Sequence, residues 1–189
     1  MSRWEPNARE RLAQAALDLY AERGFEQTTV AEIASRAGLT ERTFFRHFAD
    51  KREVLFAGGS DLAERMVSGV VDAPASVAPM DAVAAGLGAG AEILEERRAF
   101  AFKRAGVIAA SAELQERELI KLASLAAALS DALRRRGVTE PTASLTAQAG
   151  IAVFHVAFAR WVDGGDELGL PEVIRDSLDQ LRAVTAGAG

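Results

Sequence analysis

The 189-residue sequence has no cysteine and only two histidines, His47 and His155, so several chemistries are excluded at the outset. Without cysteine there is no disulfide framework and no thiolate metal site. The two histidines lie about a hundred residues apart and form no metal-ligand spacing or acid–base pair. No glycine-rich phosphate loop follows a strand, because no segment shows the alternating pattern of a strand. We therefore expect neither an enzyme nor a cofactor.

Long hydrophobic runs are also missing. No stretch approaches the roughly 20 consecutive apolar residues that a membrane span needs, and residues 1–6 have no apolar core typical of a signal peptide. Hydrophobic residues make up 49% of the chain and charged residues 26%, which is the balance of a folded globular protein. The sequence therefore predicts a cytoplasmic protein without a membrane partner.

Positive charge is scarce, because 22 basic residues are outnumbered by 27 acidic ones and the net charge is −5. Its distribution is uneven: residues 1–56 contain nine of each sign, and the whole acidic excess lies in the remainder. Between residues 40 and 52, four basic side chains accompany two acidic ones. A small basic segment of this kind suits modest contact with phosphates.

Apolar residues recur at helical spacing along almost the whole chain. We predict helices at about 9–23, from 29, from 40, and at 51–71, 80–97, 99–111, 113–136, 141–163 and 171–185. The short turn at residues 37–40 is typical of a helix-turn-helix. The predicted fold class is all-α. It has an N-terminal three-helix DNA-binding domain at 1–50, with a reading unit at 29–48, and a second, six-helix domain at 51–189.

The predicted helix ends carry capping residues. Three pairs have the spacing of a capping box, in which each side chain bonds the other's backbone N–H: Asn7 with Glu10, Thr29 with Glu32, and Asp50 with Glu53. Gly24 supplies the positive φ that ends the first helix, and Gly38 breaks the second. Short helices with fixed ends indicate a compact unit that tertiary packing stabilises.

The third helix is the candidate DNA-reading helix, because the major groove admits one α-helix and its first turns meet the bases. Phe44 and Phe48 are four residues apart and are predicted to face the core, which turns Arg42, Phe45 and Arg46 outward. An arginine suits a bidentate contact with guanine, and an exposed phenylalanine suits a thymine methyl. The predicted DNA contacts are Thr29, Thr40, Arg42, Thr43, Phe45, Arg46, His47 and Lys51.

Lys51 is predicted to lie beside the phosphates in the first turn of the fourth helix, where free N–H groups favour an anion. For Arg42 the alternative is a solvated or ion-paired surface arginine, and for His47 it is a purely local hydrogen bond.

At these residues the sequence resembles the TetR family of transcriptional regulators. The matching elements stand in the family's order and spacing over about 50 residues: Ala15-Ala16, Leu19-Tyr20, Gly24-Phe25, Thr28-Thr29-Val30, Ile33-Ala34, Ala37-Gly38-Leu39-Thr40, Thr43, Phe45, His47-Phe48, Lys51 and Leu55. The resemblance implies a homodimer that contacts a double-stranded DNA operator, and a divergent helical domain that binds a small effector. Arg42 replaces a commonly small residue and Phe45 a common tyrosine. Phe45 is therefore expected to make apolar contacts where a hydroxyl would bond a phosphate.

Side chains beyond residue 51 supply a candidate effector pocket. The candidates are Met66, Leu94, Phe100, Phe102, Lys103, Ile108 and Phe154. Lys103 is a possible inward cation for an anionic ligand group, with solvent exposure as its alternative. Ordinary core packing is the alternative for each apolar side chain.

The last two helices supply a candidate dimer interface, because two helices from each copy can form a four-helix bundle. The candidates are Ile151, His155, Phe158, Trp161, Ile174, Leu178 and Leu181. A place in the core, or contact with a ligand, is the alternative for His155 and Trp161.

Together these features predict a transcriptional regulator, in the first place a repressor that a small, mostly apolar effector releases from a palindromic operator. A ligand between the long helices would favour a dimer with the wrong half-site spacing. The fourth helix, with Gly58-Gly59 as a bend point, is the candidate lever. An activator, or a helical interaction module without small-molecule control, is the alternative.

Overall fold

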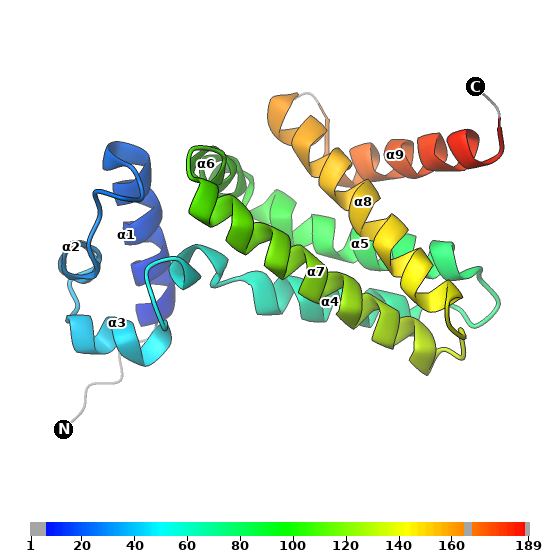
Figure 1. Ribbon diagram of the computed structural model, residues 1–189, viewed down its shortest axis with the longest axis horizontal. Helices are drawn as coiled ribbons and strands as arrows, with labels where there is room; N and C mark the ends of the chain where they lie inside the picture. The colour runs from blue at the N-terminus through cyan, green and yellow to red at the C-terminus, as the bar shows by residue number, and fades with distance from the viewer. Residues whose placement is uncertain (1–6, 165–167, 188–189) are drawn as a thin grey trace. The chain divides into compact units, whose positions relative to one another are not determined.

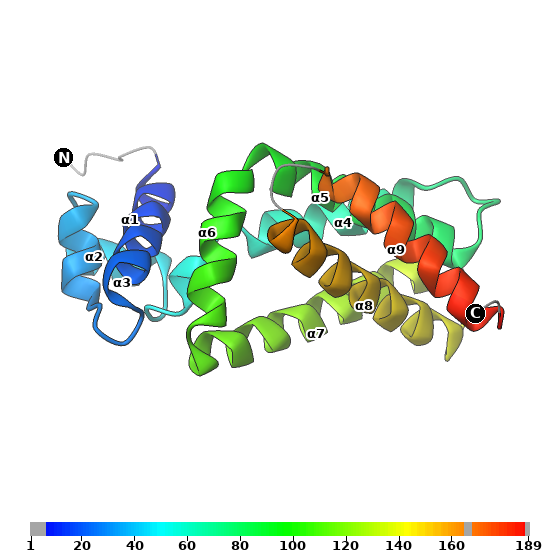
Figure 2. The same ribbon diagram turned by 90° about the horizontal axis from the view of Figure 1, so that it is seen from above.

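The computed structural model describes residues 7–164 and 168–187, and within these ranges every regular element is helical (Figures 1 and 2). The elements are α1 (Ala8–Arg23), α2 (Val30–Arg36), α3 (Glu41–His47), the 3-10 helix η1 (Glu53–Phe56), α4 (Gly59–Asp72), α5 (Pro79–Glu96), α6 (Arg98–Ala109), α7 (Ala112–Arg135), α8 (Thr142–Asp163) and α9 (Leu170–Thr185). The predicted all-α class is confirmed. Each predicted helix is present, but the one expected at 51–71 is interrupted.

The interruption follows from local capping and from glycine. Asp50 Oδ1 accepts the backbone N–H groups of Arg52 at 2.8 Å and of Glu53 at 3.1 Å, which opens η1. Gly58 and Gly59 then separate η1 from α4, and a Cβ at either glycine would meet nothing within 4 Å. The expected box is incomplete, because the carboxylate of Glu53 pairs with Arg117.

The other predicted caps have mixed outcomes. The box between Thr29 and Glu32 is confirmed: Glu32 Oε2 accepts the Thr29 backbone N–H at 2.9 Å, and Thr29 Oγ1 accepts the Glu32 N–H at 3.3 Å. Gly24 and Gly38 end α1 and α2 with φ of 87° and 66°. The box predicted at Asn7 is wrong, because Asn7 has a φ of 71° and its side chain caps no backbone N–H.

The helices group into two compact units. The first contains the chain through Gly59 together with Ala99–Glu118, so it includes α1–α3, η1, most of α6 and the first turns of α7. The second contains Ser60–Arg98 and the chain from Leu119 onward, so it includes α4, α5, most of α7, α8 and α9. The first unit therefore extends beyond the N-terminal three helices. The domain boundary at residue 50 stays a prediction.

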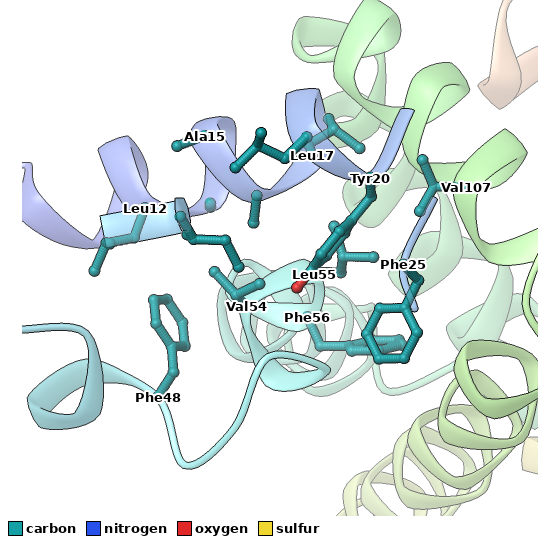
Figure 3. Packing of buried hydrophobic residues seen from close by; sticks show 14 of the residues in the cluster. Leu12, Ala15, Leu17, Tyr20, Phe25, Phe48, Val54, Leu55, Phe56 and Val107 are labelled. Carbon is teal, nitrogen blue, oxygen red and sulfur yellow. The ribbon is translucent and has the colours of Figure 1, made fainter. Parts of the chain in front are cut away.

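One apolar core stabilises the first unit (Figure 3). Phe44 and Phe48, predicted to face inward from the reading helix, are 0% and 4% exposed. Ile108 of α6 and Leu114 of α7 belong to the same core, together with Leu12 of α1. Each such side chain contributes about 1.5–3 kcal/mol when it is fully buried. The core that positions α3 is thus completed by residues far along the chain.

Close helix contacts built on glycine characterise the second unit, in which α5, α8 and α9 pack against one another (Figure 2). A Cβ at Gly86 of α5 would lie 2.5 Å from the carbonyl oxygen of Met66 and 2.7 Å from Val70 Cγ2 of α4. On α8, a Cβ at Gly150 would clash with the Val83 side chain. A Cβ at Gly86 would therefore overlap the backbone of α4, and a Cβ at Gly150 would overlap a valine side chain of α5.

Most of the predicted dimer-interface residues lie in the core of the second unit. Ile151, Trp161, Ile174 and Leu178 are 8% exposed or less, so they have almost no surface for a partner. His155 is exposed, whereas Phe158 and Leu181 are half-buried. The helical period correctly found apolar faces on α8 and α9, but these faces pack inside one chain.

The outer face of α8 is apolar as well. Leu145 and Val156 are 66% and 52% exposed, and Ala152 lies between them. By length and composition alone, α8 meets the criterion for a membrane-spanning helix. Ala147, Phe154 and Trp161 of the same helix are buried in the second unit, as expected of a core helix.

Candidate nucleic-acid interface

The turn between α2 and α3 has a fixed backbone. Gly38 adopts a φ of 66°, and the Leu39 N–H donates to the Ala34 carbonyl at 2.8 Å. Arg11 of α1 donates to the Ala37 carbonyl, and a Cβ at Gly38 would lie only 3.0 Å from Arg11 Nη2. The positive φ favours glycine here, and the entry to α3 is thereby set.

The side chains of α3 divide as its helical period predicts. Phe44 is completely buried, whereas its neighbour Phe45 is 56% exposed and touches the edge of the Phe44 ring, with centroids 5.5 Å apart. Arg42 and Arg46 are also exposed. An exposed aromatic ring between two arginines offers both an apolar and a cationic surface.

Most basic side chains of the N-terminal helices are engaged within the protein. Six of the eight between residues 7 and 59 contact a carboxylate or a backbone carbonyl: Arg9, Arg11, Arg23, Arg36, Lys51 and Arg52. Within the described ranges, Arg42 and Arg46 make no hydrogen bond or ion pair. These two arginines therefore keep all their donors for another molecule, which favours the functional interpretation of Arg42 over an ion-paired surface residue.

The three threonines predicted to contact DNA lie at helix N-termini. Thr40 Oγ1 accepts the Thr43 N–H at 3.2 Å and lies 3.0 Å from Thr43 Oγ1, so these hydroxyls cap α3. Thr29 Oγ1 donates to Glu32 Oε2 at 2.9 Å. The Thr29 bonds hold the pKa of Glu32 below its usual range and keep the carboxylate charged. DNA contact by these residues stays a prediction.

His47 lies at the end of α3 with Nε2 buried and, in the part of the chain that the structure describes, without a hydrogen-bond partner. Burial lowers the pKa of His47, and the positive charges of Arg46 and Arg9 lower it further. The imidazole is therefore neutral near pH 7. The predicted phosphate contact of His47 stays a prediction.

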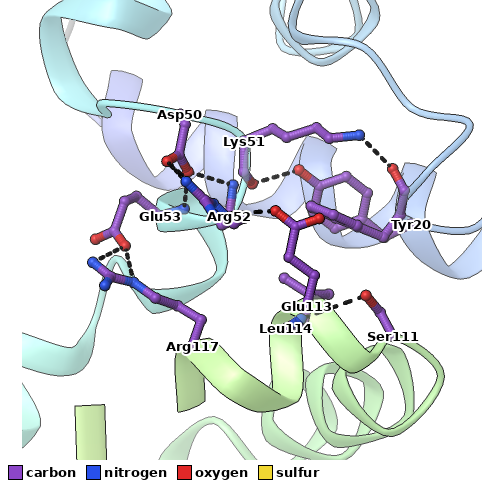
Figure 4. A network of polar contacts seen from close by, with 10 residues as sticks. Tyr20, Asp50, Lys51, Arg52, Glu53, Ser111, Glu113, Leu114 and Arg117 are labelled. Carbon is purple, nitrogen blue, oxygen red and sulfur yellow. Dashed lines mark hydrogen bonds and ion pairs between the residues drawn. The ribbon is translucent and has the colours of Figure 1, made fainter. Parts of the chain in front are cut away.

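Lys51 does not occupy the predicted position in a helix, because it precedes η1 (Figure 4). Its ammonium group donates to the carbonyls of Phe25 at 2.9 Å and Thr28 at 3.2 Å and lies 3.5 Å from that of Glu26. Tyr20 donates its hydroxyl to the Lys51 carbonyl at 2.6 Å. The ammonium expected beside phosphates is thus bound by the turn between α1 and α2.

Further ionic contacts connect η1 and the residues before it with α7 inside the first unit (Figure 4). Arg52 pairs with Asp50 and with Glu113 of α7, and Glu53 pairs with Arg117. The hydrogen bond from Arg52, aided by backbone N–H groups, keeps the pKa of Asp50 low. Sequence analysis missed Glu113 and Arg117, because their partners lie about 60 residues away and no local spacing marks them.

The predicted effector pocket is divided between the two units. Phe100, Phe102, Lys103 and Ile108 belong to the first unit, and Met66, Leu94 and Phe154 to the second. Of the two orientations that the sequence left open for Lys103, the structure has the surface one, in which Lys103 pairs with Asp18. Ile108 is a core residue of the first unit, and Phe100 packs against that core. These three are therefore better explained by packing and ion pairing than by a ligand.

Comparison with known proteins agrees with this arrangement. The family profile described as "Bacterial regulatory proteins, tetR family" matches residues 12–57, and the profile "MftR C-terminal domain" matches residues 77–186. The HTH-type transcriptional regulator TcmR of Streptomyces glaucescens is 39% identical over 75 residues, which cover 40% of this chain. The matched segment spans only 33% of the length of TcmR.

Two solved structures share the fold along nearly the whole chain. A putative TetR-family regulator from Syntrophomonas wolfei has a TM-score of 0.69 at 18% identity and covers 95% of both chains. FadR of Thermus thermophilus, a TetR-family repressor solved in complex with lauroyl-CoA, has a TM-score of 0.60 at 22% identity and covers 92% of both chains.

Proposed function

The chain belongs to the TetR family of bacterial regulatory proteins, and we propose that it is a repressor that binds a palindromic operator as a homodimer and is released by a small, mostly apolar effector. Members of this family are DNA-binding transcriptional regulators rather than enzymes. The observation that carries the proposal is the surface of α3, where Arg42 and Arg46 flank the exposed Phe45 without partners in the described ranges. Because the protein acts on DNA, its proposed location is the cytoplasm.

Each side chain on α3 has a proposed role in reading the major groove. Arg42, in the first turn, suits a bidentate contact with O6 and N7 of guanine. Phe45 lacks a hydroxyl and suits the methyl group of thymine. Arg46, one turn later, lies where it can reach a phosphate. The operator half-site is therefore expected to contain a guanine and a thymine in adjacent contact positions.

We propose that the second copy packs on the outer face of α8. Exposed Leu145, Ala152 and Val156 lie along this face, with His155 beside them. This proposal replaces the four interface candidates that are buried inside the chain. A two-fold dimer would present two copies of α3 to half-sites about 34–36 Å apart, which is one turn of DNA.

The effector is proposed to bind in the second unit. Of the pocket candidates, Met66, Leu94 and Phe154 lie there, and an apolar lining suits an apolar ligand. The lauroyl-CoA complex of the structurally similar FadR makes a fatty acyl-CoA the first probe to test. Allosteric coupling of about 1–3 kcal/mol would lower operator affinity roughly 5–150-fold.

Gly58 and Gly59 are proposed to act as the bend between the DNA-binding and effector-binding parts. They lie where the chain passes from the first unit to the second, and neither Cβ would meet an obstacle. The double variant Gly58→Ala/Gly59→Ala should therefore fold while weakening ligand-induced release. Unchanged ligand affinity together with unchanged release would exclude this role.

A selection from random DNA duplexes tests the proposed function. The repressor should enrich a palindrome, and the affinity for that duplex should fall steeply with salt. Addition of lauroyl-CoA or shorter and longer acyl-CoAs to the complex then tests for release. Enrichment of no sequence would favour the alternative of a helical interaction module, whereas operator binding unaffected by any effector would leave an uncontrolled regulator or activator.

A further inference from the structure

The turn between α1 and α2 forms an acceptor site for the ammonium group of Lys51. Three backbone carbonyls, of Phe25, Glu26 and Thr28, lie 2.9–3.5 Å from Nζ, which also lies 4.2 Å from the centroid of the Phe25 ring. A lysine ammonium has three N–H donors and no acceptor, so these carbonyls can match its whole donor set. Backbone dipoles and an aromatic face therefore stabilise the charge inside the protein.

The backbone of Lys51 is bound at the same time. Its carbonyl accepts the hydroxyl of Tyr20 at 2.6 Å, and Tyr20 is only 3% exposed. Burial, and next the charge of Asp50, raise the pKa of Tyr20 far above its usual value, so the hydroxyl is protonated and can donate. Lys51 is thus attached to α1 through its carbonyl and to the α1–α2 turn through its side chain.

These bonds connect the two segments that carry the proposed DNA contacts. The turn leads directly to Thr29, the N-cap of α2, and Thr28 closes the turn by donating Oγ1 to the Gly24 carbonyl at 2.9 Å. Lys51 follows the end of α3 by four residues. A bond from Lys51 to the turn therefore fixes the end of α3 relative to the start of α2.

We propose that Lys51 is a positioning residue for operator binding: it holds the N-terminus of α2 and the reading helix α3 at the spacing that DNA requires, and it is not a phosphate ligand. The proposal rests on the proposed function, since it concerns the affinity for an operator. Lys51 would thus have a structural role inside the protein, although its positive charge alone would suggest a contact with a phosphate.

The test compares Lys51→Met with Arg46→Met in the full-length protein. Both variants remove one positive charge and keep an unbranched side chain, but Arg46 has no partner within the described ranges. Affinity for the selected duplex is measured from low to high salt, at a temperature where circular dichroism shows each variant to be folded. Hydrogen exchange of residues 24–29 is measured in the free protein.

We expect Lys51→Met to lower operator affinity about tenfold, since charge-assisted hydrogen bonds are lost. The salt slope should remain that of the wild type, and exchange of residues 24–29 should become faster. Arg46→Met should leave the exchange unchanged and reduce the slope by about 0.9 per copy, as expected for a lost phosphate contact.

Two results would overturn the positioning role while leaving the proposed function intact. A slope reduced by about 0.9 per copy with unchanged exchange would make Lys51 a phosphate ligand. Faster exchange with unchanged affinity would make it a residue that only stabilises the turn. If the wild-type protein showed no sequence preference, both the proposed function and the role of Lys51 in it would fail.

Discussion

The two units of this protein are stabilised in different ways. In the first unit, long cationic side chains donate hydrogen bonds to backbone carbonyls that lie far away in the sequence. Arg11 donates to the Ala37 carbonyl, Lys51 to carbonyls of the α1–α2 turn, and Arg104 Nε to the Leu55 carbonyl at 2.9 Å. The second unit also has such bonds, since Arg136 donates to the carbonyls of Val71, Ala73 and Pro74, but its helices touch through glycine as well: at Gly86 and Gly150 a single added methyl group would collide with a neighbouring helix.

This difference indicates which geometry each unit keeps constant. Bonds to specific carbonyls define one geometry for the turns around α3, and a DNA-reading helix depends on such a geometry. Glycine contacts define instead how closely α4, α5 and α8 approach, because little can be inserted between their backbones. Added volume at these glycines is therefore expected to destabilise the second unit, and loss of the cationic bonds around α3 to disturb the first.

The largest effect is expected on the outer face of α8. Val156→Glu places a charge in the proposed interface between two copies, so the protein should become monomeric. Operator affinity should then fall by about 10²-fold or more, because two linked half-site contacts are lost. Sedimentation velocity and DNA titration measure both quantities. The exposed Val71 of α4 provides a control, and Val71→Glu should remain dimeric. A Val156→Glu dimer would remove this interface from the account.

Adding one methyl group to α5 should have opposite effects at a close helix contact and at an open position. Gly86→Ala should destabilise the protein by about 1–3 kcal/mol, because the new Cβ overlaps the backbone of α4. Gly88→Ala on the same helix has nothing within 4 Å and should be neutral or stabilising by about 0.5–1 kcal/mol. Denaturant unfolding compares the two variants. Equal stabilities would show that α4 and α5 do not pack as closely as described.

Substitutions of Arg42 test the proposed DNA-reading surface of the first unit. Arg42→Ala should reduce discrimination at one base pair of each half-site by about 1–3 kcal/mol. Arg42→Lys keeps the charge but lacks the planar pair of donors, so it should preserve the salt slope and still lose the preference for guanine. Competition between duplexes that differ at single positions measures this. If Arg42→Ala bound all duplexes less well by one common factor, Arg42 would be a phosphate contact.

The smallest effect concerns pH. The folded protein holds the pKa of His47 below its ordinary value, chiefly through burial. The unfolded chain then takes up a proton first as the pH falls, so the stability linked to His47 is present above about pH 6.5 and declines below it. His47→Gln should flatten the decline in the free energy of unfolding between neutral and mildly acidic pH. An identical pH profile in the variant would contradict this assignment.

Short-range patterns allowed much of the fold to be predicted. The Thr29–Glu32 box depends on residues three apart, and the inward Phe44 and outward Phe45 follow from one helical period. Asn7 had the same spacing to a glutamate, but its positive φ removes the cap. Periodicity also could not decide which face of α8 packs in its own chain, because both faces are apolar. The four interface candidates buried by the structure are the consequence.

Long-range contacts could not be predicted. The acceptors of Lys51 lie 23–26 residues before it, and Arg117 lies 64 residues after Glu53. No repeat or spacing marks such pairs, since they depend on how α1, η1 and α7 pack. Sequence analysis therefore found the exposed surface of α3, but it did not foresee the internal bonds of Lys51 or the ion pair of Lys103 with Asp18.

The central claim is that Arg42 and Arg46 of α3 contact DNA, and one titration tests it most directly. Affinity for the selected operator is measured against salt for Arg42→Ala/Arg46→Ala and for Arg23→Ala/Arg36→Ala, whose arginines pair with Glu32 and Glu22. Both double variants remove two charges per chain. The account predicts that the α3 variant loses sequence preference through Arg42 and about 0.9 of salt slope per copy through the phosphate contact of Arg46, whereas the paired-arginine variant keeps both. Equal losses in the two variants would contradict it.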